Sequence, residues 1–350
     1  MEQKNVNRAN HEAILETYMH SHSALPFVFS PNSRFIYNSS TDPYYNLALE
    51  EWFMKNCDDD VFILWQNRPT VVIGRYQNAY AEVNVPFAEK NGIFVVRRMS
   101  GGGAVYHDLG NVNFTFIVKD EGGGIDFVRF LKPIKEALAS LGVETRISGR
   151  NDLLMDGKKI SGSAQCRKFG KVLHHGTLLV DVNVDALSSV LNISSEKLVS
   201  KGISSVRSRV TNIKDVYPEI DVHSIIYALT ERFSGREIML DEREKSEVEL
   251  LAKEKYSSWD YVYGNSKTLS KTVRERFDGG SIEFSFDAAN GIINDVKIGG
   301  DFFADGEVSS IENALIGCRL SIDDLVSALE NAECKIHGIQ PTEIARTLLK

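Results

Sequence analysis

The stretch Arg97-Arg98-Met99-Ser100-Gly101-Gly102-Gly103-Ala104-Val105-Tyr106-His107-Asp108 places two arginines beside three consecutive glycines. The apolar run 93–96 precedes it and predicts a buried strand that ends at the arginines. Glycines let a ligand approach bare backbone, and N–H groups next to arginines form a site for anionic oxygens such as those of phosphate. The alternative is a hairpin turn beside a salt-bridged strand end.

The composition predicts a water-soluble globular protein. The chain has 350 residues, of which 43% are hydrophobic and 25% are charged, so one large domain or two domains are expected. The net charge of −8 argues against nucleic acid as the main partner. We find neither a membrane-spanning run nor a signal-peptide core. Because the four cysteines form no CxxC pair, we expect free thiols in a reducing, cytoplasmic environment.

Changes in pattern along the chain predict an α+β protein with two domains. Residues 1–33 are a weakly patterned N-terminal extension, and 34–240 combine helical stripes with short apolar strands. The highly charged segment 241–255 predicts a linking helix. Alternating strands and a helix then predict a small α+β domain over 256–350.

Three local patterns define elements of the larger domain. Thr41-Asp42-Pro43 predicts the start of a helix, because a capping residue precedes proline at the first turn. The strands 61–65 and 70–73 are predicted to form a hairpin across Asn67-Arg68-Pro69. The alternating residues Val112, Phe114, Phe116 and Val118 are predicted to line one face of a strand.

Asp156-Gly157 predicts a two-residue hairpin turn between two further strands. That register would place Leu154 opposite Lys159 and Asp152 opposite Ser161, all on one sheet face. Asp152 and Lys159 would be diagonal neighbours, roughly 7–8 Å apart at the backbone. Such a pair can form an ion pair or together bind a metal–phosphate group. A solvated surface lysine is the alternative, although the small residues that follow Lys159 allow close approach of a ligand.

Two further features carry possible binding groups. His174 and His175 are adjacent, so on a strand they point to opposite faces and do not bind one metal together. A basic cluster surrounds 202–205, either as a solvated loop or as a contact for phosphate or an acidic partner. Its members are Lys197, Lys201, Arg207 and Arg209.

Six motifs, taken together and in this order, resemble those of the lipoate–protein ligases. They are Asn46–Glu51, Arg97–Asp108, Asn151–Leu153, Lys159–Ala164, His174–Leu178 and Val206–Val210. The resemblance covers roughly Asn46 to the end of the chain. It implies an α+β fold of the biotin/lipoate protein ligase type. A mixed β-sheet catalytic domain would span 34–240, and a small α+β accessory domain would span 256–350.

The resemblance also implies a two-step reaction that depends on ATP and Mg²⁺. The carboxylate of lipoate attacks the α-phosphorus of ATP, which gives lipoyl-AMP and pyrophosphate. A lysine amine of an acceptor protein then attacks lipoyl-AMP and releases AMP. The implied acceptors are the E2 lipoyl domains of 2-oxoacid dehydrogenase complexes and the glycine cleavage H protein. A monomer that binds neither nucleic acid nor membrane is expected.

Site residues follow from the resemblance, residue by residue. Lys159 would be catalytic, bridging the lipoate carboxylate and the α-phosphate. The implied ATP and adenylate site comprises Arg98, Gly103, Ala104, Val105, Tyr106, Asn151, Asp152 and Lys159. The implied lipoate site comprises Trp65, Arg98, Gly102, His107, Lys159 and Ser161. Asp152 would also contact Mg²⁺, and core packing is the alternative role for Trp65.

Two other functions fit parts of the pattern. The first is an octanoyl- or lipoyl-transferase with a cysteine nucleophile, for which Cys166 is the candidate. Cysteine-dependent relatives are expected to carry the thiol before Asn151, and the segment 145–150 has none. Cys166 also lacks a basic neighbour in sequence and is expected to be a buried small residue. The second is a non-catalytic lipoyl-binding module, against which the combination of Arg98, the glycines and Lys159 argues.

Overall fold

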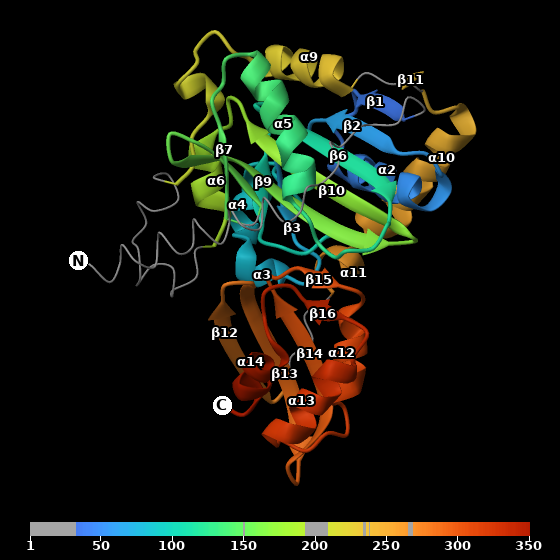
Figure 1. The fold of residues 1–350 in the computed structure, drawn as a ribbon, viewed down its shortest axis with the longest axis vertical. Coiled ribbons are helices and arrows are strands. Elements are labelled where there is room, and N and C mark those ends of the chain that lie inside the picture. The colour runs from blue at the N-terminus through green and yellow to red at the C-terminus, as the bar shows by residue number, and fades with distance from the viewer. Residues whose placement is uncertain (1–32, 150, 193–208, 234–235, 238, 265–268) are drawn as a thin grey trace, which may run out of the picture.

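The larger part of the molecule is built on an eight-stranded mixed sheet between two layers of helices (Figure 1). The computed structural model describes residues 33–149, 151–192, 209–233, 236–237, 239–264 and 269–350. The strands of this sheet are β1 (Arg34–Asn38), β2 (Val61–Trp65), β6 (Asn111–Lys119), β7 (Arg146–Ser148), β8 (Asp152–Met155), β9 (Lys158–Lys168), β10 (Lys171–Leu179) and β11 (Arg236–Glu237). Their order is β11-β1-β2-β6-β10-β9-β8-β7. Because β1 pairs in parallel with β2 and β11 and the other pairs are antiparallel, the predicted mixed sheet is confirmed.

The N-terminal extension predicted over 1–33 lies outside the described residues except for Ser33, and the basic cluster lies outside them except for Arg209. The helical segments of the larger part are α2 (Pro43–Asn56), α3 (Ala79–Glu82), α4 (Val85–Lys90), α5 (Val128–Ser140), α6 (Val184–Val190), η1 (Ile213–Asp215), α9 (Val222–Phe233), α10 (Glu242–Leu251), η2 (Ala252–Tyr256) and α11 (Trp259–Val262). None of the helices in the described part of the chain is long and apolar enough to cross a membrane.

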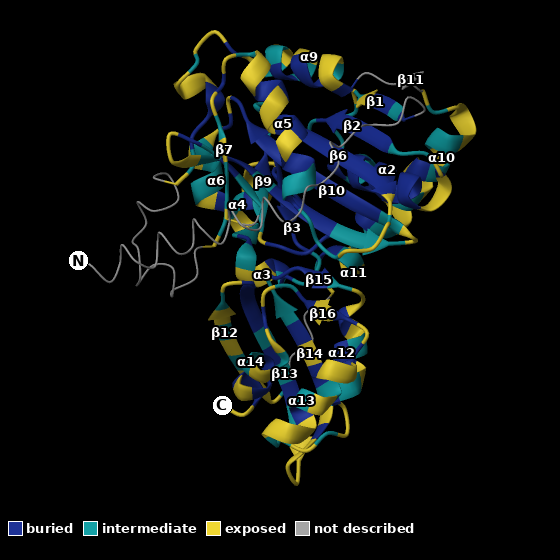
Figure 2. Ribbon diagram, viewed as in Figure 1, coloured by how far each residue is buried: buried dark blue, intermediate teal, exposed yellow. Residues whose placement is uncertain are grey.

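Strand β6 shows how the sheet divides its two faces. As predicted, Val112, Phe114, Phe116 and Val118 point together into one core, where they pack against α5 and α9. The intervening Asn111, Asn113 and Thr115 are also buried, but they point to the opposite face. Figure 2 shows the central strands buried beneath helices whose outer sides are exposed. One face of β6 is therefore an apolar core, while the other carries polar groups into the interior.

Helix α2 covers the polar face and begins where the sequence predicts. The Asp42 side chain accepts hydrogen bonds from Tyr44 N at 2.9 Å and Tyr45 N at 3.2 Å, and Pro43 occupies the first turn. These contacts satisfy backbone donors that have no partner inside the helix. The cap fixes the start of the helix that carries Glu50 and Glu51 to the centre of the molecule.

A second sheet joins β4 (Phe94–Arg97), β3 (Thr70–Ile73) and β5 (Val105–His107) in the order β4-β3-β5. The hairpin predicted between 61–65 and 70–73 is therefore wrong, because β2 and β3 belong to different sheets. The connecting Asn67 is fully buried. It accepts a hydrogen bond from Asn46 Nδ2 at 2.8 Å, and its own Nδ2 lies 3.2 Å from His107 Nδ1. Asn67, which the sequence placed in a hairpin turn, instead links the two sheets.

The hairpin at Asp156-Gly157 is confirmed, but its predicted register is wrong beyond Leu154. Leu154 pairs with Lys159 as expected. A bulge between Leu153 and Leu154 then places Asp152 opposite Gly162, whereas Ser161 lies opposite Leu153. One extra residue in β9 thus turns Ser161 to the interior face that Leu153 occupies.

The C-terminal part has its own apolar core and is α+β, as predicted. Its strands and helices are β12 (Lys271–Phe277), β13 (Gly280–Ala289), β14 (Ile292–Gly300), β15 (Ala304–Asp305), α12 (Val308–Leu315), α13 (Ile322–Asn331), β16 (Lys335–Ile336) and α14 (Pro341–Leu348). Strands β12, β13 and β14 form an antiparallel sheet, and β15 pairs with β16. Figure 1 shows this part below the larger one, next to α3 and α11.

The charged segment 241–255, predicted as a linker, forms α10 and most of η2, which pack on α2. Buried Glu51 of α2 lies 2.5 Å from Lys255 Nζ and 2.8 Å from Lys55 Nζ, and it accepts a hydrogen bond from Tyr256 Oη at 2.7 Å. Burial alone would raise the pKa of Glu51, but its hydrogen bonds to Lys255, Lys55 and Tyr256 outweigh burial and lower the pKa to about 2. This contact fixes the segment to the larger part.

The two parts meet at the glycine loop, Gly101–Gly103. Gly102 N donates to Phe302 O at 3.0 Å, and a Cβ on Gly101 would lie 2.2 Å from that same carbonyl oxygen. A Cβ on Gly102 would lie 2.8 Å from the ring of Phe303, and the φ of +86° at Gly102 also favours glycine. Two of the three glycines are therefore needed so that the C-terminal part can pack against the loop.

Ion pairs surround this contact. Glu307 lies 2.5 Å from Arg75 Nη2 and 3.0 Å from Lys168 Nζ. Asp305 lies 2.9 Å from Arg167 Nη1. Acidic groups of the C-terminal part thus face basic groups of the larger part around the contact between the glycine loop and the Phe302 carbonyl.

We predict that Gly101→Ala weakens the packing of the C-terminal part, because the new methyl group overlaps the Phe302 carbonyl. Overpacking of this kind costs about 1–3 kcal/mol. Thermal unfolding should show the loss, and small-angle scattering should show a larger radius of gyration. Gly103→Ala is the matched control, since a Cβ there meets no atom within 4 Å. If the two variants have the same unfolding temperature and radius of gyration, the predicted role of Gly101 in this contact is wrong.

Candidate active site

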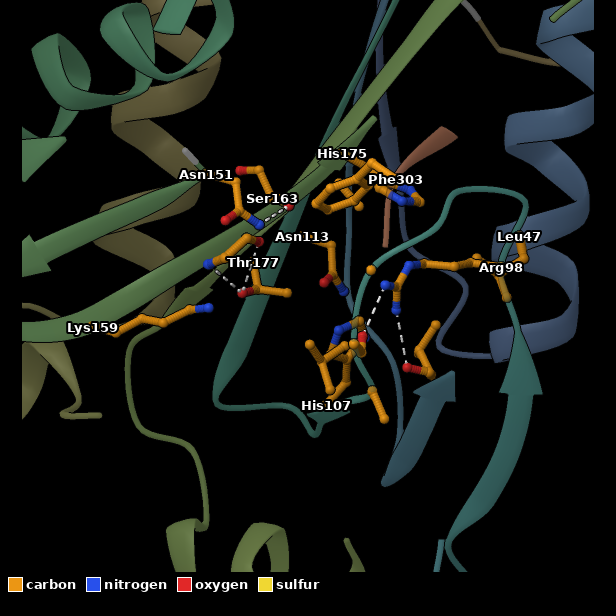
Figure 3. Close-up of a pocket in the computed structure, with 18 of the residues that line it drawn as sticks. Leu47, Arg98, His107, Asn113, Asn151, Lys159, Ser163, His175, Thr177 and Phe303 are labelled. Carbon is orange, nitrogen blue, oxygen red and sulfur yellow. Dashed lines mark hydrogen bonds between the residues drawn. The ribbon is translucent and has the colours of Figure 1, made fainter. Parts of the chain in front are cut away.

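A cavity of about 140 Å³ opens between the two sheets. Nine residues predicted for the nucleotide or lipoate site line it: Trp65, Arg98, Gly102, Gly103, Ala104, Val105, His107, Asn151 and Lys159. Residues that the sequence analysis assigned to neither site complete the lining: Leu47, Val72, Asn113, Gly162, Ser163, Ala164, His175, Gly176, Thr177 and Phe303. In the view of Figure 3, Lys159 and Arg98 flank the cavity, with Asn113 and His107 drawn between them.

The floor of the cavity is a row of residues that crosses the large sheet. Trp65 of β2 pairs with Asn113 of β6, which in turn pairs with Thr177 of β10. Gly162 N of β9 donates to Thr177 Oγ1 at 3.3 Å. The row therefore runs from Trp65 at one end to the Lys159 strand at the other.

Lys159 has a fixed place at one end of this row. Its Nζ lies 2.7 Å from Asp152 Oδ1, and both side chains are about one-third exposed, at 34% and 32%. A Cβ on Gly162 would lie 2.7 Å from the same Nζ, so glycine makes room for the lysine to extend across the strand. On the side away from β8, Lys159 N donates to Arg209 O, and Lys159 O accepts a hydrogen bond from Thr211 N. A partly exposed ammonium group therefore faces the cavity from a rigid strand.

Arg98 is buried, and its guanidinium binds the glycine loop. Its Nη2 donates to Gly101 O at 2.6 Å and Gly103 O at 2.8 Å, and its Nη1 donates to Val72 O at 3.1 Å. Burial lowers the pKa of Arg98 to about 10, so the group stays charged at neutral pH. The structure places Arg98 at the predicted site, where its side chain fixes the shape of the loop.

A chain of buried hydrogen bonds connects this loop to α2. Ser100 Oγ accepts from Arg98 Nε at 3.1 Å and lies 2.6 Å from His175 Nε2. His175 Nδ1 lies 2.9 Å from Glu50 Oε1, which also accepts from Thr115 Oγ1 at 2.6 Å. Since Glu50 accepts, His175 Nδ1–H donates, and the Ser100 hydroxyl donates to Nε2. The chain has a nucleophile–base–acid arrangement, but Ser100 is fully buried and does not line the cavity. The chain of hydrogen bonds therefore positions the glycine loop.

The other predicted site residues, Tyr106, Asp152 and Ser161, are not among those that line the cavity. Tyr106 packs in the core of the second sheet, and Ser161 is buried on the face of Leu153. Asp152 reaches the site through its ion pair with Lys159. Cys166, the alternative nucleophile, is not among the lining residues, and burial raises the pKa of its thiol to about 12. A thiolate is therefore strongly disfavoured there at neutral pH.

The adjacent histidines point to opposite faces, as predicted. His174 is buried beside the rings of Phe114 and Phe130, and neither ring nitrogen has a partner within the described residues. His175 lines the cavity. Sequence reasoning missed His175 and Asn113 as site residues. The available signal was the alternation of polar and apolar residues in 111–116, which marks a strand whose second face is polar yet buried.

We predict that His175→Ala separates the loop from Glu50 and removes one hydrogen bond from each of two buried groups, the Ser100 hydroxyl and the Glu50 carboxylate. The expected loss of stability is about 1–3 kcal/mol or more, since one group is a carboxylate. Lipoate-dependent ATP–pyrophosphate exchange should fall roughly 10- to 100-fold, because the loop carries the N–H donors.

His174→Phe is the matched control for this variant. It removes two unpartnered nitrogens from an aromatic core, so stability should stay within about 1 kcal/mol or rise, with exchange retained. Similar losses in both variants would show that the His175 chain has only a packing role.

Comparison with known proteins identifies the family. A profile described as the lipoyl protein ligase A/B catalytic domain matches residues 42–234, and one described as the bacterial lipoate protein ligase C-terminus matches 266–348. Lipoate-protein ligase LplJ of Bacillus subtilis is 41% identical over 305 residues, covering 84% of this chain and 92% of that protein. Lipoate–protein ligase 1 of Staphylococcus aureus is 38% identical over 300 residues, covering 83% and 92%.

Solved structures agree with these sequence relatives. P. falciparum LipL1 in complex with lipoate has a TM-score of 0.73 at 22% identity, covering 87% of this chain and 95% of that one, and shows the shared fold. A bipartite lipoate protein ligase from Thermoplasma acidophilum, studied with its E2 lipoyl domain, has a TM-score of 0.62 at 30% identity, covering 69% and 99%. A lipoate-protein ligase A bound with ATP has a TM-score of 0.57 at 29% identity, covering 67% and 99%. The chain belongs to the lipoate–protein ligase family.

Proposed function

We propose that the protein activates lipoate with ATP to form lipoyl-AMP and transfers the lipoyl group to a lysine of acceptor proteins. The observation that carries this function is Lys159, fixed beside Asp152 at one end of a cavity that the glycine loop also borders. Joining a carboxylate to a triphosphate requires compensation of negative charge at the reacting atoms. Lys159 supplies a partly exposed ammonium group, and the loop supplies backbone donors.

The first step needs an in-line approach of the two anions. A carboxylate oxygen of lipoate attacks the α-phosphorus and its lone pair forms the new O–P bond. The P–O bond to pyrophosphate breaks, and its electron pair leaves on the pyrophosphate oxygen. Lys159 Nζ can contact the carboxylate and the α-phosphate together, which offsets their repulsion. In the second step the acceptor amine attacks the acyl carbon and AMP leaves. Lys159 again stabilises the negative charge that develops.

Mg²⁺ would bind beside this lysine. Among the described residues no group of three or more His, Cys, Asp or Glu side chains could form a metal site. Mg²⁺ commonly binds through one or two carboxylates together with substrate phosphates and water. Asp152 offers such a carboxylate, so it fits an ion that arrives with the nucleotide. The ion would supply charge neutralisation at the phosphates.

The acceptors that we propose are E2 lipoyl domains of 2-oxoacid dehydrogenase complexes and the glycine cleavage H protein. Support comes from the T. acidophilum relative, which was studied with its E2 lipoyl domain. We further propose a cytoplasmic monomer. Free cysteines among the described residues are consistent with a reducing compartment.

We predict that Lys159→Ala lowers the rate of lipoyl-AMP formation at least about 100-fold, the effect of losing one donor to a developing oxyanion. The measurement is lipoate-dependent ATP–pyrophosphate exchange. The fold should persist, because this side chain is one-third exposed. Lys158→Ala is the matched control, since Lys158 is an exposed lysine in the same strand, and its exchange rate should be unchanged.

Cys166→Ser tests the alternative transferase mechanism. The variant should retain exchange and transfer, since the thiol does not line the cavity. A folded Lys159→Ala enzyme with normal exchange would disprove the proposed role of the lysine. A lipoyl thioester trapped on Cys166 would favour the transferase.

A further inference from the structure

A second arginine, Arg97, is buried beside Arg98 but is not among the residues that line the cavity. Its side chain is 1% exposed, and burial lowers its pKa to about 10, so the guanidinium stays charged at neutral pH. A buried cation is tolerated only when its donors are satisfied. Here the acceptors are five backbone carbonyl oxygens: those of Gly74, Arg75 and Gln77, at 2.9, 3.0 and 2.6 Å from Nη1, that of Tyr261, at 2.9 Å from Nε, and that of Val262, at 2.6 Å from Nη2.

These acceptors come from two segments that are far apart in the sequence. Segment 74–77 follows β3, whereas Tyr261 and Val262 belong to α11, which precedes the strands of the C-terminal part. One guanidinium therefore joins a loop of the second sheet to the last helix before the C-terminal part. Its planar fork of donors suits this role, because an ammonium group cannot bond to both segments in the same geometry.

The same segment packs against the glycine loop. Arg75 N donates to Ser100 O at 2.9 Å, and a Cβ on Gly74 would lie 2.0 Å from Gly102 O. Gln77 Oε1 accepts a hydrogen bond from Gly74 N at 2.8 Å, which fixes the turn of the segment. A displacement of the segment would therefore move the backbone from which the loop offers its N–H groups.

The C-terminal part also contacts this segment. Tyr76 O accepts a hydrogen bond from Gly300 N at 3.0 Å, and the ring of Tyr76 stacks on that of Phe302 at a centroid distance of 5.0 Å. Arg75 adds its ion pair with Glu307. Four residues of chain therefore contact Arg97, the glycine loop and the C-terminal part together.

We propose that Arg97 is a positioning residue for ATP binding, which acts through segment 74–77 on the glycine loop. The inference rests on the proposed function, in which this loop offers backbone donors to the nucleotide phosphates. The floor of the cavity lies on the large sheet, which supplies none of the acceptors of Arg97. Loss of the guanidinium should therefore weaken the binding of ATP more than that of lipoate.

The first test is Arg97→Lys in the full-length protein. Calorimetry measures the Kd of ATP, and ATP–pyrophosphate exchange gives the KM of ATP and the KM of lipoate. The Kd and the KM of ATP should each rise about 10-fold, because the ammonium group cannot hold both segments and a small displacement of binding groups is costly. The KM of lipoate should stay close to the wild-type value.

Leu138→Ala is the control for a general loss of stability. Leu138 is buried in the core beneath α5 and α9, and no residue of segment 74–77 belongs to that core. The variant should unfold at a lower temperature, while its Kd for ATP stays at the wild-type value. If Arg97→Lys also unfolds earlier but keeps the wild-type Kd and KM of ATP, Arg97 has only a structural role and the inference is wrong.

A second comparison tests the route through the segment. Gln77→Leu removes the side-chain acceptor of Gly74 N and should raise the same two constants for ATP. If both substitutions act on one segment, the rise in the double variant should be smaller than the product of the two single effects. A rise equal to that product would mean that the two residues act independently, and it would overturn the inference.

The outcomes separate this inference from the proposed function. If the wild-type protein binds ATP but shows no lipoate-dependent exchange, the proposed function fails, and calorimetry still decides the role of Arg97. If the wild-type protein binds no ATP, both fail. If wild-type exchange is normal and the KM of ATP and the KM of lipoate rise equally in Arg97→Lys, the proposed function stands and the inference is discarded.

Discussion

The buried guanidinium of Arg98 connects most of what defines the site. It donates to three carbonyl oxygens, of Val72, Gly101 and Gly103, and to the hydroxyl of Ser100. A buried charge of this kind is tolerated only when its donors are satisfied. The requirement fixes the path of the glycine loop, and the loop in turn borders the cavity and contacts Phe302 of the C-terminal part. The path of the glycine loop, the border of the cavity and the contact with the C-terminal part thus depend on the Arg98 side chain.

The reaction that this family carries out brings two anions together, and the protein meets that demand with groups of different kinds. Arg97 and Arg98 supply positive charge, but both are bonded to backbone oxygens. Lys159, which lines the cavity, is partly exposed and forms an ion pair with Asp152. In the proposed reaction the loop would stay fixed while Lys159 contacts the reacting atoms in both steps.

Sequence patterns with a local physical cause were predicted well. The Asp42 cap, the Asp156-Gly157 turn and the opposite faces of His174 and His175 each depend on residues close together in the chain. The bulge in β9 was missed because it follows from packing that no local pattern records, and it moved Ser161 away from the cavity.

The polar floor and the Glu50–His175–Ser100 chain were missed for a related reason. They join α2, β10 and the glycine loop, which are distant in sequence and meet only in the folded molecule. The prediction that β2 pairs with β3 was wrong for the same reason. The two strands belong to different sheets, and the buried Asn67 connects them.

The most direct test of this account is lipoate-dependent ATP–pyrophosphate exchange by Arg98→Lys. The variant keeps a positive charge at the site, but an ammonium group cannot reproduce the planar fork that reaches Val72, Gly101, Gly103 and Ser100. If the guanidinium fixes the loop, exchange should fall at least about 100-fold, comparable with the loss of a preorganised donor. Exchange near the wild-type rate would show that charge alone suffices, and would contradict the account.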